Sequence, residues 1–135
     1  MKTDELRLGN FLKYDDTILC EVAEIYNNVI YCFDKYGEDL HRMEFVKPIE
    51  LTEDILIKAG FKKGYNEIYS KTIKNDFYEY NISYQNVKDN KYSFVASGYK
   101  NNELKRQIRL DNIQYLHQLQ NAYYLLTNQE LKIDL

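Results

Sequence analysis

The sequence predicts an α+β fold: an N-terminal SH3-like β-barrel lobe, a short helix, then an antiparallel β-meander packed by a long C-terminal helix. Short β-branched and aromatic stretches separated by turn residues fill the first fifty positions, and four more such stretches follow the short helix. One long pattern of helical period lies near the end. We expect parts at residues 1–50, 51–61 and 62–135, either distinct or joined in one compact unit.

The N-terminal lobe is predicted from strands at about residues 6–14, 17–26, 29–33 and 40–47. Turns are expected at Asp15-Asp16, at Asn27-Asn28 and at residues 36–39. Apolar residues occur on both strand faces around Asn27-Asn28, which favours a closed barrel or a covered sheet over a hairpin with one wet face.

The two cysteines are predicted to be free, structural thiols. A two-residue hairpin at Asn27-Asn28 would place Cys32 opposite Ala23 and turn Cys20 to the other face of the sheet. A disulfide is not favoured in that register.

The short helix has a clear beginning and end. Thr52 is a suitable N-cap, and Leu51 and Leu56 occupy the positions of a hydrophobic staple. Gly60 is typical of the residue after a helix C-terminus, so the helix is expected at about residues 53–59.

The next section alternates again, with strands expected at residues 67–73, 77–84, 92–99 and 103–110. The C-terminal helix is expected from about Ile113 to Thr127, capped by Asp111 or Asn112. It should pack across the meander through one apolar stripe, made of Tyr115, Leu116, Leu119, Ala122, Tyr123 and Leu126.

Charge is divided along the chain. Residues 1–57 hold 6 basic and 13 acidic residues, whereas residues 58–109 hold 11 basic and 5 acidic ones. Basic residues among tyrosines on a sheet suit a single-stranded nucleic acid, which needs phosphate neutralisation and rings for stacking. The candidate residues for this face are Lys71, Tyr80, Lys91, Tyr92, Lys105, Arg106 and Arg109.

The charge pattern is also compatible with two arrangements that involve no nucleic acid. The tyrosines could pack beneath the helix while the lysines lie in solvated turns, as most charge runs do. The acidic and basic regions could also attract each other, within one molecule or between two.

The C-terminal helix is unusual because residues 112–129 contain no Asp, Glu, Lys or Arg. A helix with one wet face normally carries charges there, so a second contact is indicated, with the barrel lobe, another subunit or a partner protein. A helix that exposes a neutral polar face is the alternative. The candidate contact face consists of Gln114, His117, Gln118, Asn121 and Tyr124.

Catalytic and cofactor signatures are absent from the sequence. The chain has no Walker loop, GxGxxG, HExxH or CxxC, and its two histidines, His41 and His117, lack ligand-type neighbours at helical spacing. We therefore expect no enzyme activity, no cofactor and no metal. No apolar stretch approaches the roughly 18 residues of a membrane span, and the N-terminus lacks the apolar region of a signal peptide, so a cytoplasmic protein without a membrane partner is expected.

Three stretches form a recognisable series: residues 5–10 (ELRLGN), residues 48–53 (PIELTE) running to Gly60-Phe61, and residues 115–123 (YLHQLQNAY). Together they resemble a group of short uncharacterised proteins of Bacteroidales bacteria and of their phages and mobile elements. The resemblance implies such an origin and a bacterial host cell, and no particular activity.

The leading functional hypothesis is a non-catalytic interaction or accessory protein, phage- or mobile-element-encoded, whose C-terminal helix contacts a protein partner or a second copy. The alternative is a nucleic-acid-binding module that uses residues 58–109. A third hypothesis is sequestration of a small anionic ligand in a groove between the lobes.

Overall fold

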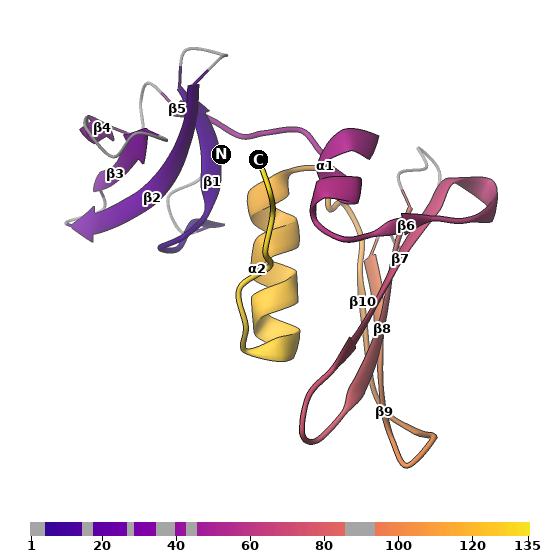
Figure 1. Ribbon diagram of the computed structural model, residues 1–135. Helices are drawn as coiled ribbons and strands as arrows, with labels where there is room; N and C mark the ends of the chain where they lie inside the picture. Colours follow the sequence, from indigo (N-terminus) through magenta and orange to yellow (C-terminus); the bar gives the residue numbers. More distant parts are fainter. Residues whose placement is uncertain (1–4, 15–17, 27–28, 35–39, 43–45, 86–93) are drawn as a thin grey trace. The chain divides into compact units, whose positions relative to one another are not determined.

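The computed structural model describes residues 5–14, 18–26, 29–34, 40–42, 46–85 and 94–135. As predicted, the fold is α+β, and it contains two sheets of antiparallel strands (Figure 1). Contacts divide the chain into two compact units, one of residues 1–51 and 114–131, the other of residues 52–113 and 132–135. The C-terminal helix thus belongs with the N-terminal sheet, whereas the sequence grouped it with the meander. Packing of the helix across the meander stays a prediction.

The first sheet has five strands: β1 (Phe11–Tyr14), β2 (Ile18–Tyr26), β3 (Val29–Asp34), β4 (Leu40–Arg42) and β5 (Val46–Lys47). Their order across the sheet is β4-β3-β2-β1-β5. Alternate residues of β1, β2 and β3 point into one apolar core, which contains Leu6, Leu12, Cys20, Val22, Ile30, Cys32 and Val46. The SH3-like assignment of this lobe stays a prediction, and the predicted turns at residues 15–16, 27–28 and 36–39 lie outside the described residues.

The expected register of the cysteines is wrong. Cys32 pairs with Val22 rather than with Ala23, because the register shifts by one residue between Val22 and Glu24. This bulge reverses the inward face of β2 part-way along the strand, so Cys20 and Cys32 both lie in the core. Both are buried, and neither forms a disulfide.

The second unit begins with α1 (Glu53–Lys58), which follows the predicted signals closely. The Thr52 hydroxyl accepts a hydrogen bond from Ile55 N (3.3 Å), as an N-cap should. The helix ends at Ala59, and Gly60 adopts a left-handed conformation with φ of 89°. That conformation favours glycine, so the predicted C-terminal signal is confirmed.

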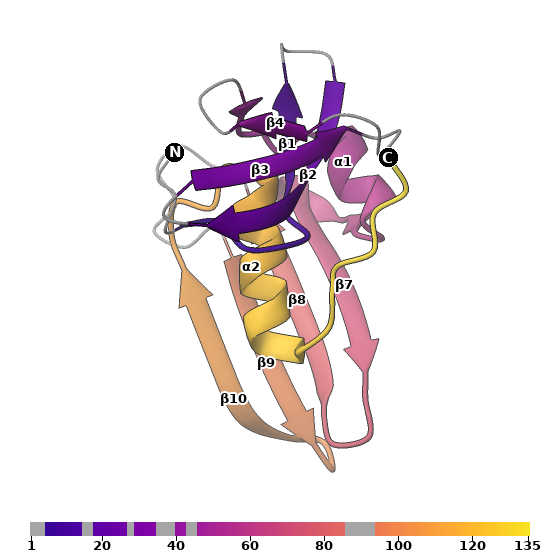
Figure 2. The same cartoon turned by 90° about the vertical axis from the view of Figure 1, so that its left-hand side faces the viewer.

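The second sheet contains β6 (Lys62–Lys63), β7 (Ile68–Lys74), β8 (Glu79–Gln85), β9 (Phe94–Lys100) and β10 (Glu103–Leu110), and a short 3₁₀ turn (Tyr65–Glu67) precedes β7. The order is β10-β9-β8-β7-β6, so each strand pairs with its neighbour in sequence as the predicted meander requires (Figure 2). One face, which we term the buried face, carries Tyr69, Tyr80, Ile82, Tyr84, Phe94 and Ala96. Most residues of the opposite face are polar and exposed, although Ser97 is buried and Val95 is half-buried.

The last helix, α2 (Leu116–Thr127), begins later than the sequence predicts, and neither Asp111 nor Asn112 caps it. The N-cap is instead Tyr115, whose backbone is extended. The Gln114 carbonyl accepts from Leu51 N (3.0 Å), and Leu116 N donates to the Ile49 carbonyl (2.8 Å). The Gln118 side chain accepts from the backbone N–H of Tyr115 (3.1 Å) and so satisfies a helix-start donor that lacks a carbonyl partner. Among the described residues, neither α1 nor α2 is long and apolar enough to cross a membrane.

A close approach of β8 to β9 gives the first prediction. A Cβ atom on Gly98 would lie 2.9 Å from Cε1 of Tyr80, whose side chain is buried. We expect Gly98→Ala to lower the free energy of unfolding by about 1–3 kcal/mol, because the buried ring has little room to retreat. Chemical denaturation measures this cost. In a Tyr80→Leu background the same substitution should cost much less, and an equal cost in both backgrounds would contradict the proposed clash.

Candidate interaction surfaces

The uncharged helix α2 is fixed to the N-terminal segment by the side chain of Gln120. Its amide oxygen accepts from Phe11 N (2.8 Å), and its amide nitrogen donates to the Gly9 carbonyl (3.1 Å). Gln120 is 1% exposed. One neutral side chain thus satisfies a backbone donor and a backbone acceptor at the beginning of β1, which a charged side chain could not do without a desolvation cost.

Asn121 adds two more hydrogen bonds on the same side of the helix. Its amide oxygen accepts from Asn10 Nδ2 (2.8 Å), and its amide nitrogen donates to the Glu5 carbonyl (2.7 Å). Asn10 is fully buried, and its own amide oxygen accepts from Arg7 N (2.9 Å). The segment 5–11 therefore lies along α2 through a continuous chain of amide hydrogen bonds.

Arg7 closes this contact at the far end of the helix. Its guanidinium makes a bidentate ion pair with the Glu130 carboxylate and also donates to the Gln120 carbonyl (3.2 Å). The same group lies 4.3 Å from the centre of the Tyr124 ring, at a distance typical of cation–π contacts. Arg7 thus binds the helix, its C-terminal extension and an aromatic side chain at once.

The candidate helix face is therefore largely engaged within the first unit. Asn121 and Tyr124 contact the N-terminal segment, and the Gln118 side chain accepts hydrogen bonds from the two N–H groups just before the helix. His117 is buried, and Gln114 contributes backbone groups to the bridge with residues 49–51. Of the contacts left open by the sequence, the one with the N-terminal lobe is observed.

His117 is the exception in this polar contact, because neither ring nitrogen has a hydrogen-bond partner. Its Nε2 lies 3.7 Å from a carboxylate oxygen of Glu5, and its ring stacks on Tyr115 with centroids 5.9 Å apart. Burial lowers the pKa of His117, and the nearby Glu5 carboxylate partly opposes this shift. The folded protein therefore favours the neutral imidazole.

The thiols are poorly placed for chemistry. Burial, together with the neighbouring Cys20, raises the pKa of Cys32 to about 12. The reactive form of a cysteine is the thiolate, so this side chain remains a protonated component of the core at neutral pH.

The basic, tyrosine-rich candidates of the second unit do not form one face. Lys71 and Tyr80 lie on the buried face, where Tyr80 is 2% exposed and Lys71 Nζ donates to the Ala59 carbonyl at the end of α1 (2.8 Å). Burial also lowers the pKa of Lys71. Lys91 and Tyr92 lie outside the described residues. The remaining three, Lys105, Arg106 and Arg109, all belong to β10.

Three tyrosines of the second unit are core residues. Tyr69, Tyr80 and Tyr84 are buried, and the Tyr84 hydroxyl donates to the Ile113 carbonyl (2.9 Å). Burial raises the pKa of Tyr84 to about 12. These rings are not accessible for base stacking, so Tyr80, the described tyrosine of the predicted nucleic-acid face, is used for packing.

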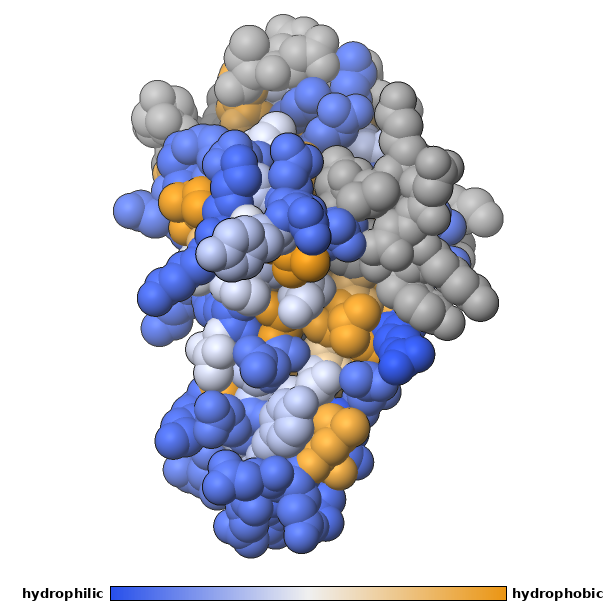
Figure 3. Space-filling view, turned by 90° about the vertical axis from the view of Figure 1, so that its right-hand side faces the viewer, coloured by the Kyte–Doolittle hydropathy of each residue, from blue (hydrophilic) through white to orange (hydrophobic). Residues whose placement is uncertain are grey.

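Strand β10 is the most exposed of the four long strands of the second sheet. It forms the outer edge of the strand order, and its residues are exposed except for half-buried Ile108 and Leu110. Its exposed-face residues Gln107 and Arg109 are joined by a hydrogen bond (3.1 Å), and Gln107 also donates to the Ser97 hydroxyl of β9 (3.1 Å). Figure 3 shows one face of the molecule on which hydrophilic residues predominate and apolar residues form small patches.

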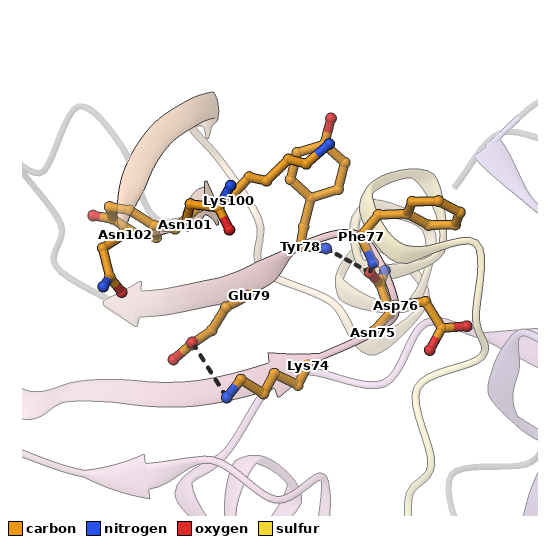
Figure 4. A pocket seen from close by; sticks show the side chains of 10 residues that line it. Lys74, Asn75, Asp76, Phe77, Tyr78, Glu79, Lys100, Asn101 and Asn102 are labelled. Carbon is orange, nitrogen blue, oxygen red and sulfur yellow. Dashed lines mark hydrogen bonds and ion pairs between the residues drawn. The ribbon is translucent and has the colours of Figure 1, made fainter.

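A polar cavity of about 330 Å³ lies between the turns of the β7–β8 and β9–β10 hairpins (Figure 4). The Asn75 side chain accepts from the N–H groups of Phe77 and Tyr78 (both 2.8 Å), which fixes the first turn. Lys74 faces Glu79 at 3.9 Å. Two lysines and two carboxylates share the lining, so the cavity does not select one sign of ligand charge.

A second cavity, of about 340 Å³, lies in the first unit beside the Gln120 contact. It is lined by Leu8, Gly9, Phe11, Glu21, Gln120, Glu130 and Leu131. Glu130 is already paired with Arg7. The cavity therefore offers apolar walls and one further carboxylate.

Within the part of the chain that the structure describes, no group of three or more His, Cys, Asp or Glu side chains is placed to hold a metal ion. Comparison with protein-family models, with curated proteins and with solved structures finds no match. The assignment of function therefore depends on the geometry of this chain alone.

Sequence reasoning missed Arg7, Asn10, Gln120 and Glu130 as parts of one contact. They come from two separate stretches, Glu5–Asn10 and the stretch from Gln120 to Glu130. The structure brings these two together although they lie more than one hundred positions apart. Periodicity cannot reveal such a pairing, since it reports only neighbours within one element.

Removing the Gln120 side-chain amide tests the helix contact. We expect Gln120→Leu to lower the free energy of unfolding by about 2 kcal/mol or more, because Phe11 N and the Gly9 carbonyl would lose their partners inside the protein. Chemical denaturation of this variant should be compared with Gln114→Leu, at an exposed position. Equal stability of the two variants would mean that the Gln120 hydrogen bonds contribute nothing net.

The lowered pKa of His117 predicts a pH dependence of stability. The unfolded chain binds a proton at the ordinary histidine pKa of about 6.5, whereas the folded protein resists protonation. The stabilising effect of the neutral ring is therefore fully present above about pH 6.5 and is lost as the pH falls below that value. Unfolding measured at several pH values should show this loss, and His117→Gln should remove this component. A pH dependence unchanged by His117→Gln would contradict the assignment.

Proposed function

We propose that this chain is a non-catalytic interaction protein, an accessory to another protein, and that it binds its partner along the edge strand β10. The observation that carries the proposal is the exposed edge. Among the described residues β10 has a strand neighbour on one side only, and residues 103–108 make no backbone hydrogen bond outside the sheet. An unpaired strand edge is a ready template for an extended segment of another protein.

The engagement of α2 supports this choice of surface. Its polar face, expected to receive a partner, contacts residues 5–11 of the same chain through Gln120 and Asn121. A partner would have to displace several buried hydrogen bonds to reach that face. The edge of β10 requires no such displacement.

The state of the potential nucleophiles supports a non-catalytic role. Cys20 and Cys32 are buried among apolar side chains, and His117 is buried with its pKa lowered. A nucleophile needs an activating base and access for substrate, and neither cysteine has both in this arrangement.

Nucleic-acid binding remains a second candidate, favoured by the presence of Lys105, Arg106 and Arg109 on one exposed strand. Phosphate contacts alone would give weak, salt-dependent binding, because the buried tyrosines are not available for stacking. Sequestration of a small anionic ligand between the lobes, the phage or mobile-element origin and the bacterial host cytoplasm stay predictions.

Selection of peptides from a displayed random library tests the proposed surface without knowledge of the partner. Peptides enriched on the wild-type protein should protect alternate amides of residues 103–108 from hydrogen exchange, because an added strand pairs with every second residue. Adjacent residues of a strand point their N–H groups to opposite sides, so only one of Gln107→Pro and Ile108→Pro removes an outward-facing N–H. The enriched peptides should bind that variant at least about tenfold more weakly, a loss of about 1.4 kcal/mol of binding free energy.

The matched controls are Gln107→Ala and Ile108→Ala, which keep the backbone N–H. Each proline variant is used only if its denaturation remains cooperative. Enriched peptides that protect other segments and ignore both prolines would overturn the assignment of the surface, as would a selection that yields no binder.

A further inference from the structure

Strand β10 carries an excess of positive charge at the edge where an added strand would lie. Lys105, Arg106 and Arg109 lie on it with a single acidic residue, Glu103, and Lys100 directly precedes its hairpin turn. We infer that the partner presents an acidic, extended segment, which adds to the second sheet as a strand alongside β10. This inference rests on the proposed function.

The cations of β10 project to both sides of the sheet. After the register shift between Leu104 and Arg106, Arg106 pairs with Gly98 on the buried face, whereas Arg109 pairs with Val95 on the exposed face. Successive residues of an added strand also alternate between the two faces. A matching segment therefore carries carboxylates on both of its faces rather than along one.

Arg106 is the best-oriented of these cations. Its guanidinium lies 4.7 Å from the centre of the Tyr78 ring, and Tyr78 in turn lies 5.7 Å from Tyr80. Tyr80 is held against Gly98 in the sheet. The guanidinium is thereby oriented on an aromatic surface, and among the described residues it makes no ion pair with a carboxylate. A carboxylate can bind it through two N–H groups with little further loss of side-chain freedom.

Lys105 is already paired with Glu103 (2.9 Å), but this pair is exposed. An exposed ion pair is weak, so exchange of Glu103 for a carboxylate of the partner has a small cost. Leu104, 53% exposed, offers an apolar contact next to these charges. The edge thus combines backbone hydrogen bonds, positive charge and one apolar contact.

The same charges argue against a second copy of this chain as the occupant. In a two-fold pairing of β10 with itself, two net-positive strands would lie side by side. Like charges at directly opposed or neighbouring positions of paired strands are destabilising. A complementary, negatively charged strand removes this repulsion and gains attraction at low ionic strength.

Three end-blocked peptides test the inference. Each has about ten residues, the upper end of the usual length of a strand. All share one alternating Thr and Val framework with Glu, Gln or Lys at the same positions on both faces. In fluorescence anisotropy we expect the Glu peptide to bind at least about tenfold more tightly than the Gln peptide, a difference of about 1.4 kcal/mol. Its affinity should fall with salt, and the Lys peptide should not bind.

Charge substitutions in the protein locate the effect. Arg106→Gln should weaken binding of the Glu peptide by about tenfold, and Arg106→Glu should shift preference towards the Lys peptide. Lys62→Gln, on the opposite edge strand β6, is the matched control and should leave the affinity unchanged. Hydrogen exchange should show protection of alternate amides in residues 103–108 when the Glu peptide is bound, and none with the Lys peptide.

The outcomes separate this inference from the proposed function. Equal binding of the Gln and Glu peptides at β10 would overturn the acidic partner and leave strand addition standing. If none of the three binds and the library selection also yields nothing at β10, both fall. Tighter binding of a labelled oligothymidylate, abolished by Arg106→Gln and without amide protection, would overturn the acidic segment in favour of a nucleic acid.

Discussion

The arrangement of the first unit depends on the hydrogen bonds between α2 and the segment that precedes β1. Gln120 satisfies two backbone groups at Gly9 and Phe11, and Asn121 satisfies the Glu5 carbonyl and the Asn10 amide. These contacts join residues near opposite ends of the chain. Closing so long a loop has an entropic cost, which buried and fully paired amides help to offset.

This contact accounts for the absence of charge in α2. Eight of the twelve helix residues are buried, so an ionisable side chain at most positions would lose hydration without a partner. A side-chain amide can donate and accept at once. The beginning of β1 and the turn before it require both, because a backbone N–H and a backbone carbonyl there need partners. His117 is an exception, since neither of its ring nitrogens has a hydrogen-bond partner. Burial disfavours the charged imidazolium and so lowers the pKa of His117.

The second unit separates its tyrosines from most of its charges. Tyrosines of β7 and β8 lie on the buried face, whereas Lys105, Arg106 and Arg109 lie on the edge strand β10. Cations along an edge discourage pairing between identical chains and favour an oppositely charged partner. In the proposed function such an edge would disfavour self-association and favour an acidic partner, and the Arg106 guanidinium lies 4.7 Å from the centre of the Tyr78 ring.

The amino-acid sequence by itself determined the local elements: the Thr52 and Gly60 boundaries of α1, the four long strands of the meander and the uncharged character of the last helix. Each depends on residues close together in the chain, where capping, turn preference and side-chain period act. Tertiary structure alone decided that α2 lies with the N-terminal sheet, that a bulge brings both cysteines into one core, and that Lys71 and Arg109 lie on different faces. These outcomes depend on strand register and on hydrogen bonds between distant residues, because a shift of one residue reverses every side chain that follows, and the period of one strand does not say which residues of its neighbour it pairs with.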